Sequence, residues 1–217
     1  MMFAYKYLKN KYLLEFKEKG SVRINTLYNL WYEHEKISDK WEGRSRLTVT
    51  ARKKPLSFSG EEFHRVVPKI KSNKSTIEIQ LEKGASIIQN QEVTNAFVFC
   101  TSLKLDDNLK KNFGYDAHYK IVSLDSFAKI LYEQINEIKV LRCYKAGKVK
   151  YSDKEITLID KNEILSRNVN DFFEICFTKP KKFRHEKEYR IVFVPWFSQE
   201  IEPFTLNCPE LRKYCEF

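Results

Sequence analysis

The 217 residues of this chain predict an α+β fold, with mixed, mainly antiparallel strands around a central cleft and a few flanking helices. Most apolar segments are short and alternate with polar residues at a period of two, which is typical of strands. Helical periodicity appears in few segments, and these do not alternate regularly with strands as they would in a βαβ sheet. A chain of this length buries one substantial core, so we expect a single domain over residues 1–217.

The first third of the chain begins with a strand and a helix. The aromatic alternation of "MFAYKYL" predicts a strand over residues 2–8, and "KNKYLLEFKEKG" predicts a helix over 9–20 with Gly20 as its stop signal. "SVRINTL" predicts a second strand over 21–27. Residues 28–46 show no clear period, and we interpret them as an ordered loop or a short helix.

The middle of the chain is rich in strand patterns. "RLTVTARKKPLSF" at 46–58 and "STIEIQLEKGASII" at 75–88 alternate as strands, with a Lys-containing polar linker between them. "NAFVFCTSL" at 95–103 predicts a buried strand that ends in hydroxyl residues. "SLDSFAKILYEQINEI" at 123–138 predicts an amphipathic helix with Ser123 or Asp125 as its cap.

The last third predicts a hairpin, a helix and two strands. We expect "IKVLRCYKAGKVKYS", residues 138–152, to form a hairpin that turns at Ala146-Gly147. A helical span is expected around residues 154–168. "FFEICFTKP" at 172–180 and "YRIVFVPW" at 189–196 are predicted as the closing strands.

Composition restricts partners and location. The 39 Lys and Arg exceed the 29 Asp and Glu, giving a formal net charge of +10, which favours a polyanionic partner such as nucleic acid. A surplus of this kind is also common in Lys-rich proteins with no specific use for it. No apolar run approaches the roughly 20 residues of a spanning helix, and no signal-peptide pattern opens the sequence, so we expect a cytoplasmic protein without a membrane partner.

Cysteine and histidine do not predict a metal site. The five cysteines are widely spaced and mostly in apolar contexts, so we expect free thiols and no disulfide framework. None of the four histidines pairs with a cysteine at zinc-ligand spacing.

The segment "FRHEKEYRIVFVPW" places Glu186 and Glu188 at the mouth of a predicted buried strand. Residues two apart on a strand share a face, so the two carboxylates are expected to point the same way. Like charges so placed need a partner cation, a raised pKa or a function. A purely structural explanation is that they flank an edge strand and pair with neighbouring cations, namely Arg184, Lys187 and Arg190.

Three motifs follow one another in the order found in the ADP-ribosyltransferase superfamily, which the chain resembles. "FAYKYL" leads through a helix to "GSVRINTLYNLW", "FVFCTSL" comes second and "EKEYRIVFVP" third. Those enzymes carry an Arg or His on a first strand, a Ser-Thr-Ser or aromatic motif on a central strand, and a (Gln/Glu)-x-Glu on a late strand. The chain is also similar, over nearly its full length, to a broad family of uncharacterised bacterial and phage proteins that close with Glu-x-Glu-Tyr-Arg.

The resemblance implies an NAD-dependent ADP-ribosyltransferase, a glycosyltransferase with a single catalytic domain and NAD as its substrate. Glu188 would stabilise the positive charge that develops on the ribose when the nicotinamide bond breaks, and Glu186 would bind or deprotonate the attacking group. Lys6 stands where the superfamily has Arg or His, and Arg23 is expected to hold a phosphate instead. The residues expected to bind NAD are Tyr5, Lys6, Tyr7, Arg23, Tyr28, Thr101, Ser102 and Tyr115. The tyrosines would sandwich the nicotinamide ring, although Tyr5, Tyr7 and Tyr28 are each also explained as core residues.

The basic surplus favours a nucleic-acid acceptor, RNA over DNA, as in toxins and phage-defence effectors held by an antitoxin and sometimes a chaperone. Three alternatives stay open. One is a protein acceptor. Another is a non-catalytic module in which "ARKKP", "KIKSNK" and "KPKKFR" track phosphates while aromatics stack on bases. A third is a metal-dependent nuclease using Glu186, Glu188 and Asp116, which offers few carboxylates for two metals.

Two geometric expectations follow. The strands Tyr5 to Leu8, Phe97 to Ser102 and Tyr189 to Val194 should end around one cleft, with Glu188 within roughly 15 Å of Ser102 or Tyr5. The basic side chains around Lys53, Lys181 and Lys182 should lie on the cleft side.

Overall fold

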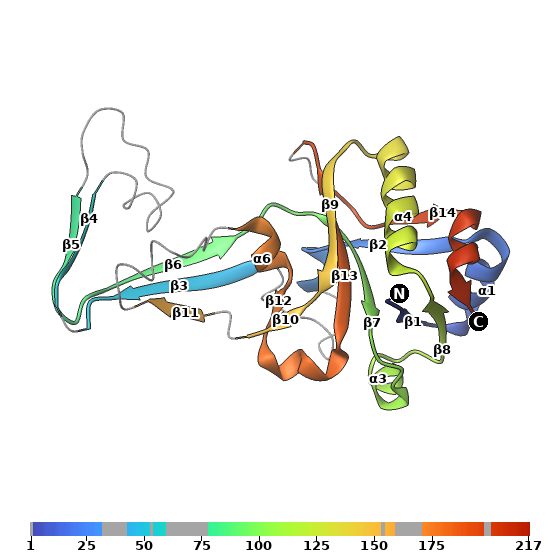
Figure 1. Cartoon of the computed structure of the whole chain (residues 1–217), viewed down its shortest axis with the longest axis horizontal. Helices are drawn as coiled ribbons and strands as arrows, with labels where there is room; N and C mark the ends of the chain where they lie inside the picture. Colours follow the sequence, from blue (N-terminus) through green and yellow to red (C-terminus); the bar gives the residue numbers. More distant parts are fainter. Residues whose placement is uncertain are drawn as a thin grey trace. The chain divides into compact units, whose positions relative to one another are not determined.

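The computed structural model describes residues 2–31, 43–52, 54–59, 78–152, 155–158, 171–197 and 201–217 (Figure 1). They form two compact units: unit 1 comprises Met1–Gly43, Thr94–Ser152 and Cys176–Phe217, and unit 2 comprises Arg44–Val93 and Asp153–Ile175. The α+β class with mostly antiparallel strands in a large sheet is confirmed. A single catalytic domain over 1–217 stays a prediction.

Unit 1 is built on one large sheet with the strand order β14-β2-β7-β1-β8-β15, in which β13 pairs with β7 and β9. All of these pairings are antiparallel. The bounds of the strands are β1 Ala4–Leu8, β2 Ser21–Thr26, β7 Phe97–Ser102, β8 Ala117–Ile121, β9 Leu141–Lys148, β13 Glu188–Pro195, β14 Phe204–Asn207 and β15 Cys215–Glu216. The strands expected over 2–8, 21–27, 95–103 and 189–196 are therefore confirmed.

The centre of the sheet is β7, which has a different arrangement on each edge. Along one edge, β13 pairs continuously from Glu188↔Ser102 to Phe193↔Phe97. Along the other edge, β2 pairs with the start of β7 at Thr26↔Phe97 and Asn25↔Val98, whereas β1 pairs with its end at Tyr5↔Ser102. Strands β1 and β2 therefore part along the middle of β7.

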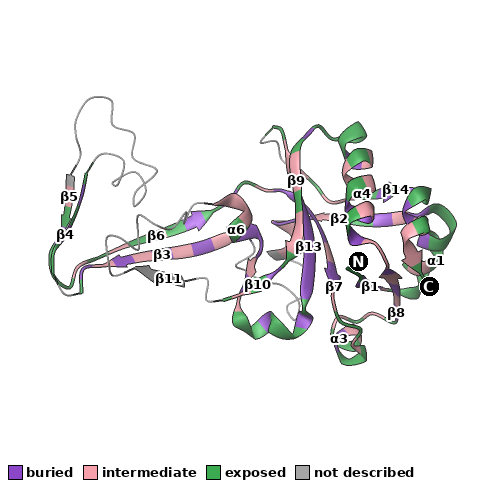
Figure 2. Ribbon diagram, viewed as in Figure 1, coloured by how far each residue is buried: buried purple, intermediate pink, exposed green. Residues whose placement is uncertain are grey.

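The helices of unit 1 cover the sheet and fix these strands. Helix α1, Asn10–Lys19, joins β1 to β2, and Phe16 is its fully buried residue, stacked on Tyr119 with ring centroids 4.3 Å apart. Gly20 ends α1 in the left-handed conformation with φ of 65°, as its sequence position predicts. Helix α4, Leu124–Ile138, buries an apolar stripe against the sheet, formed by Leu124, Phe127, Ala128, Leu131 and Ile135. Figure 2 shows β13 buried along most of its length.

The remaining segments of unit 1 are short. They are η1 Asn29–Trp31, α3 Asp107–Asn112, β10 Lys150–Tyr151, β12 Thr178–Lys179, η2 Lys181–Glu186 and η3 Pro209–Tyr214. The turn η1 agrees with the short helix expected within 28–46, of which residues 32–42 lie outside the described residues. All five cysteines are free thiols, as expected, although only Cys176 and Cys208 are fully buried.

The predicted hairpin at Ala146-Gly147 is wrong. Strand β9 runs straight through both residues, which lie opposite Ile191 and Arg190 of β13. A turn here would remove backbone pairs from the most buried strand of the sheet, so the tertiary pairing overrides the local turn preference.

The strand predicted over 172–180 is also largely wrong. Residues Phe172–Cys176 form the short helix α6, and only Thr178–Lys179 is a strand. The side chain of Asp171 accepts a hydrogen bond from the Glu174 amide at 2.9 Å, which satisfies a free donor of the first turn and favours the helix.

Unit 2 has two small sheets of its own. Strands β3 Arg44–Thr50, β6 Ser86–Glu92 and β11 Glu155–Leu158 form one, and β4 Leu56–Ser59 pairs with β5 Glu78–Leu81 in the other. Their buried core contains Leu47, Val49, Ala51, Leu56, Phe58 and Leu81. The strands expected in 46–58 and 75–88 are confirmed. The helix expected around 154–168 is wrong at β11, which pairs with β3, and the remainder of that span lies outside the described residues.

Within the described ranges, no helix is both long enough and apolar enough to cross a membrane.

Candidate active site

A cavity of about 610 Å³ opens in unit 1 where β1 and β2 part along β7. Its walls come from all three strands, from α1 and from the start of β13. This volume lies within the range of about 300–1,000 Å³ that is usual for small-molecule and cofactor sites. We call it the β7 cavity.

The three predicted strands meet at this cavity. Glu188 is the Cα partner of Ser102, and Ser102 is the Cα partner of Tyr5. Neighbouring strands lie about 4.8 Å apart, so Glu188 is well within the roughly 15 Å expected from Ser102 and Tyr5. The expectation that these strands end around one cleft is confirmed, since all three residues line the β7 cavity.

The expectation that Glu186 and Glu188 share one face of a strand is wrong. Glu186 ends the 3-10 helix η2, Lys187 adopts φ of 48°, and β13 begins only at Glu188. The carboxylates converge instead on one cation: Lys179 Nζ lies 2.6 Å from Glu186 Oε2 and 3.2 Å from Glu188 Oε2. Lys179 was not singled out in the sequence.

Arg190 completes this group. Its Nε donates to Glu188 Oε1 at 2.8 Å, and its Nη1 donates to the Cys176 carbonyl. Arg190 is fully buried, and the other three residues are 5–6% exposed. We call Lys179, Glu186, Glu188 and Arg190 the buried ion cluster; all four line the β7 cavity. Of the neighbouring cations proposed from the sequence, Arg190 is confirmed as a partner.

The electrostatics keep Glu188 charged. Burial alone would raise its pKa, but the positive charges of Arg190 and Lys179 outweigh this effect, so the pKa of Glu188 lies below its ordinary value. The Tyr151 hydroxyl accepts a hydrogen bond from the Glu188 amide at 2.7 Å, and burial raises the pKa of Tyr151 to about 12. At neutral pH the cavity wall therefore presents an ionised Glu188, whose amide contacts the neutral Tyr151 behind it.

Cys100 is not an activated nucleophile. Burial raises the pKa of its thiol, and the negative charge of Glu188 raises it further. Lys6 Nζ donates to the Cys100 carbonyl at 2.8 Å and lies 4.5 Å from the centre of the Phe99 ring. Lys6 thus reaches the backbone of β7 in the stretch where β1 and β2 have parted.

The two hydroxyls of the β7 motif line the cavity but are engaged with the backbone. Thr101 donates to the Tyr189 carbonyl at 3.0 Å. Ser102 Oγ lies 2.8 Å from the Glu186 carbonyl oxygen and 2.9 Å from that of Lys104, and its one proton serves either acceptor. Ser102 therefore ties the end of β7 to the residue that carries the first carboxylate.

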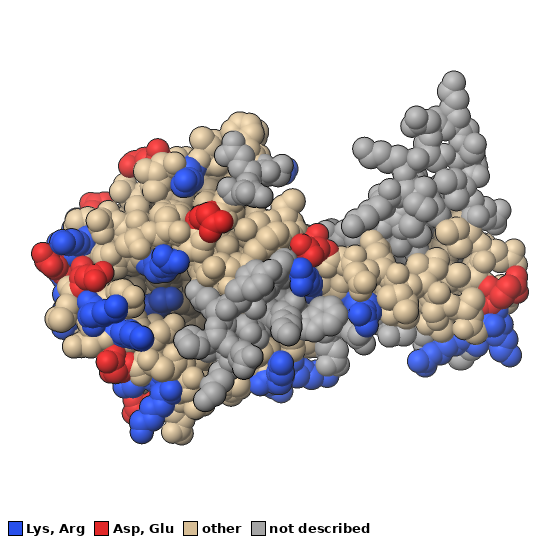
Figure 3. Space-filling view, turned by 180° about the vertical axis from the view of Figure 1, so that it is seen from behind, with Lys and Arg blue, Asp and Glu red and all other residues tan. Residues whose placement is uncertain are grey.

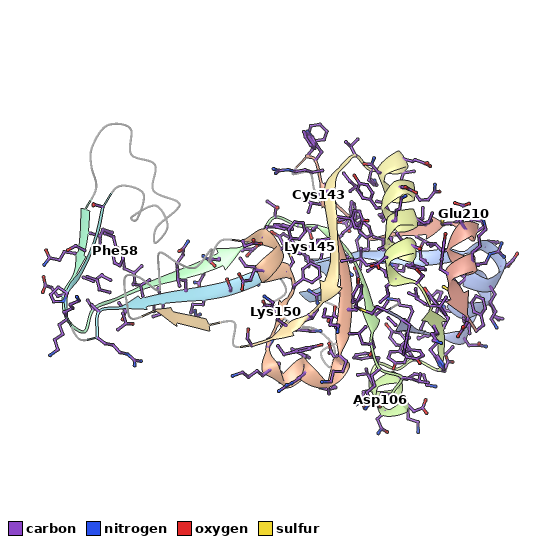
Figure 4. All side chains as sticks on the ribbon, viewed as in Figure 1. Phe58, Asp106, Cys143, Lys145, Lys150 and Glu210 are labelled. Carbon is purple, nitrogen blue, oxygen red and sulfur yellow. The ribbon has the colours of Figure 1, made fainter. Side chains whose placement is uncertain are left out.

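The other residues predicted to bind NAD differ in whether they line the β7 cavity. Tyr5, Arg23 and Tyr115 line the cavity, whereas Tyr28 is not part of its lining. Tyr7 lines the cavity but is buried; its hydroxyl donates to the Lys104 carbonyl at 2.6 Å and accepts from the Asp106 amide at 2.8 Å. Figure 4 labels Asp106, the residue that caps α3. Tyr7 thus holds this loop in place.

Several lining residues were not predicted from the sequence. Besides Lys179 and Arg190, they include Tyr12 and Glu15 of α1, Asn25 of β2 and Phe113. The segment "FTKPKKF" offered one signal for Lys179, because a lysine followed by proline inside an apolar segment is an unusual place for a charge.

The basic residues predicted on the cleft side and Asp116 are not among the described cavity-lining residues. Lys181 and Lys182 are exposed on η2 and are not part of the cavity lining, and Lys53 lies outside the described residues. On the face seen in Figure 3, Lys and Arg side chains are interspersed with Asp and Glu. Asp116 accepts a hydrogen bond from the Asn10 amide at 2.6 Å at the start of α1 and is not part of the cavity lining, whereas the two glutamates of the nuclease alternative are. Among the described side chains, no group of His, Cys, Asp and Glu is arranged to hold a metal ion.

No protein-family model, curated protein or solved structure matches this chain. The similarity to the ADP-ribosyltransferase superfamily therefore stays a prediction from the three sequence motifs.

Proposed function

We propose that the protein is an NAD-dependent ADP-ribosyltransferase that modifies nucleic acid, RNA in preference to DNA. One observation carries the proposal: an ionised, buried Glu188 at the wall of the β7 cavity, on a strand next to the hydroxyl motif of β7, whose other edge pairs with the aromatic first strand. The cavity is of a size suited to a cofactor.

In the proposed reaction, the bond between the ribose C1′ and the nicotinamide nitrogen breaks, and its electron pair leaves with nicotinamide. The ribose then carries positive charge, which the carboxylate of Glu188 stabilises more strongly in the transition state than in the ground state. An oxygen or nitrogen of the acceptor forms the new bond to C1′, and its proton passes to Glu186 or to water.

The remaining lining residues have roles in binding. Tyr5 and Tyr115 are proposed to contact the nicotinamide ring, and Arg23, exposed at the cavity wall on β2, to hold a phosphate. Lys6 is proposed to contribute positive charge beside β7. Toxin or phage-defence activity, with an antitoxin as partner, belongs to the same proposal.

The test is incubation of the pure protein with NAD labelled in its adenylate half, together with separate pools of RNA, DNA and protein. We expect label to enter the RNA pool most. Label in the protein pool alone would show that the acceptor is a protein and not a nucleic acid. Tight RNA binding without nicotinamide release from NAD would instead support the non-catalytic module.

Replacing Glu186 tests the division of labour between the carboxylates. Glu186→Gln should reduce transfer to the acceptor by on the order of 10²–10⁴-fold, the usual contribution of a general base, while hydrolysis of NAD by water falls less. Nicotinamide release and labelled acceptor are measured in the same samples. Equal losses in both would show that Glu186 does not act on the acceptor.

Lys181 and Lys182 test the nucleic-acid acceptor. If both contact phosphates, Lys181→Gln with Lys182→Gln should weaken RNA binding and lower the slope of log K against log salt by about 0.7 per lost contact on single strands. Lys129→Gln is the control, because Lys129 is an exposed lysine on α4 whose side chain is 68% exposed. An unchanged slope in the double variant would remove these lysines from the interface.

A further inference from the structure

Lys179 occupies the centre of the buried ion cluster because two short strands hold it there. Strand β12 pairs in parallel with β10, with Lys179 opposite Tyr151. The Lys179 carbonyl accepts from the Ser152 amide at 3.1 Å, and its ammonium lies 4.7 Å from the centre of the buried Phe183 ring. The backbone of Lys179 is thus fixed by β10, while its ammonium contacts the Phe183 ring and the two carboxylates.

The charges of the four cluster residues sum to zero, with two carboxylates against an ammonium and a guanidinium. Removing one partner of a buried ion pair leaves a charge that the protein interior solvates poorly. Two carboxylates close together in such surroundings bind one shared proton more tightly than a single carboxylate binds a proton in water. The ammonium of Lys179 is the group that lies between them.

We propose that Lys179 is a positioning residue that holds the Glu186 and Glu188 carboxylates side by side in the β7 cavity and keeps both of them ionised. This role goes beyond the proposed transfer reaction, since it concerns the protonation state of the two carboxylates whether or not NAD is cleaved. Its consequence for turnover rests on the proposed function.

Other groups face the carboxylates and remain in every variant considered below. Cys100 of β7 lies next to Glu188, Tyr151 of β10 contacts its amide, and Lys6 of β1 acts on Cys100. The thiol and the phenol are neutral at neutral pH, because burial raises the pKa of each. The charge balance of the carboxylates is therefore changed by Lys179 and Arg190 rather than by these neighbours.

Lys179→Met keeps the length of the side chain and removes its charge. The Glu186–Glu188 pair should then bind a proton in the folded state at pH values above about 4.3, where an unfolded glutamate has lost it. Because the folded variant binds more protons than the unfolded chain in this range, its stability should fall as pH rises. Wild type should show no such loss in this range, since the lowered pKa of Glu188 gives a stability that is fully present above about pH 4.3 and is lost only as pH falls toward that lowered pKa.

A second substitution restores the balance. In Lys179→Met with Glu186→Gln, the remaining Glu188 and Arg190 form a neutral pair, so the extra proton is no longer needed. The pH dependence introduced by Lys179→Met should disappear. Lys129→Met, a substitution at an exposed lysine of α4, controls for the loss of a lysine anywhere in the chain.

The experiment is urea unfolding of wild type and the three variants at several pH values between about 4 and 8, where one linked proton changes the unfolding equilibrium constant tenfold per pH unit. We expect Lys179→Met to approach this slope over part of the range and the double variant to lose it. Folding of the double variant where Lys179→Met alone does not fold also supports the proposal. A wild-type-like pH profile for Lys179→Met, or a double variant that is as impaired as the single one, overturns it.

The same variants separate this proposal from the transfer reaction. If wild type cleaves NAD, Lys179→Met should shift the acidic limb of its pH–rate profile to higher pH, because Glu186 and Glu188 must first lose the extra proton. If wild type does not cleave NAD, the proposed function fails, and the unfolding experiment still decides the role of Lys179.

Discussion

Glu188→Gln should lower NAD turnover by on the order of 100-fold or more while NAD still binds, which is the usual scale for losing one preorganised electrostatic contact. The amide keeps the shape of the side chain and an oxygen that accepts from Arg190, but it carries no charge to stabilise the ribose. Initial rates of nicotinamide release give turnover, and calorimetric titration gives binding.

Glu15→Gln is the matched control for this experiment. Glu15 also lines the β7 cavity but is exposed on α1, outside the buried ion cluster. Its substitution should leave turnover within about threefold of wild type, a change of less than about 0.7 kcal/mol. Arg190 is fully buried, so the folded fraction of Glu188→Gln must be measured and rates expressed per folded molecule. Wild-type activity of Glu188→Gln would contradict the proposed role.

Gly20→Ala should destabilise unit 1 by about 2–5 kcal/mol, the sum of about 1–2 kcal/mol for a left-handed residue with a Cβ and about 1–3 kcal/mol for overpacking. Gly20 has φ of 65°, and its added Cβ would meet the Cys208 carbonyl oxygen and would lie 2.7 Å from Pro209 N. Backbone atoms are the obstacle here, so side-chain rotation does not relieve the contact. Urea unfolding measures the loss.

Gly114→Ala separates the two causes. Gly114 has φ of 70°, but nothing lies within 4 Å of an added Cβ. This variant should lose only the conformational part, about 1–2 kcal/mol. Equal losses at Gly20 and Gly114 would show that the packing of Gly20 against the 208–209 backbone contributes nothing.

Local patterns predicted the elements that define the cavity, but not the way they meet. The alternation in "FAYKYL", "FVFCTS" and "YRIVFV" is visible in sequence because each strand buries residues at a fixed period. The divergence of β1 and β2 along β7 depends on which backbone atoms pair between segments far apart in the sequence, and no local period encodes it. The position of Gly20 was predicted, because helix termination is a local property.

The errors arise where the folded structure overrides a local pattern. A turn at Ala146-Gly147 is reasonable for the dipeptide, but the pairing of β9 with β13 decides the conformation there. Glu186 and Glu188 were expected to converge because of strand periodicity, whereas they converge because η2 and the left-handed Lys187 bring both to Lys179. Lys179 itself was missed because its partners become neighbours only after β12 pairs with β10.

Titration of the wild-type protein with NAD, followed by calorimetry, tests the central claim most directly. We expect saturable binding of one NAD per chain, abolished or strongly weakened by Arg23→Met and Tyr115→Ala, which change the cavity lining outside the buried ion cluster. Nicotinamide should appear in the same sample over time. Absence of NAD binding, or binding that is unaffected by both substitutions, would contradict the assignment of the β7 cavity as an NAD site.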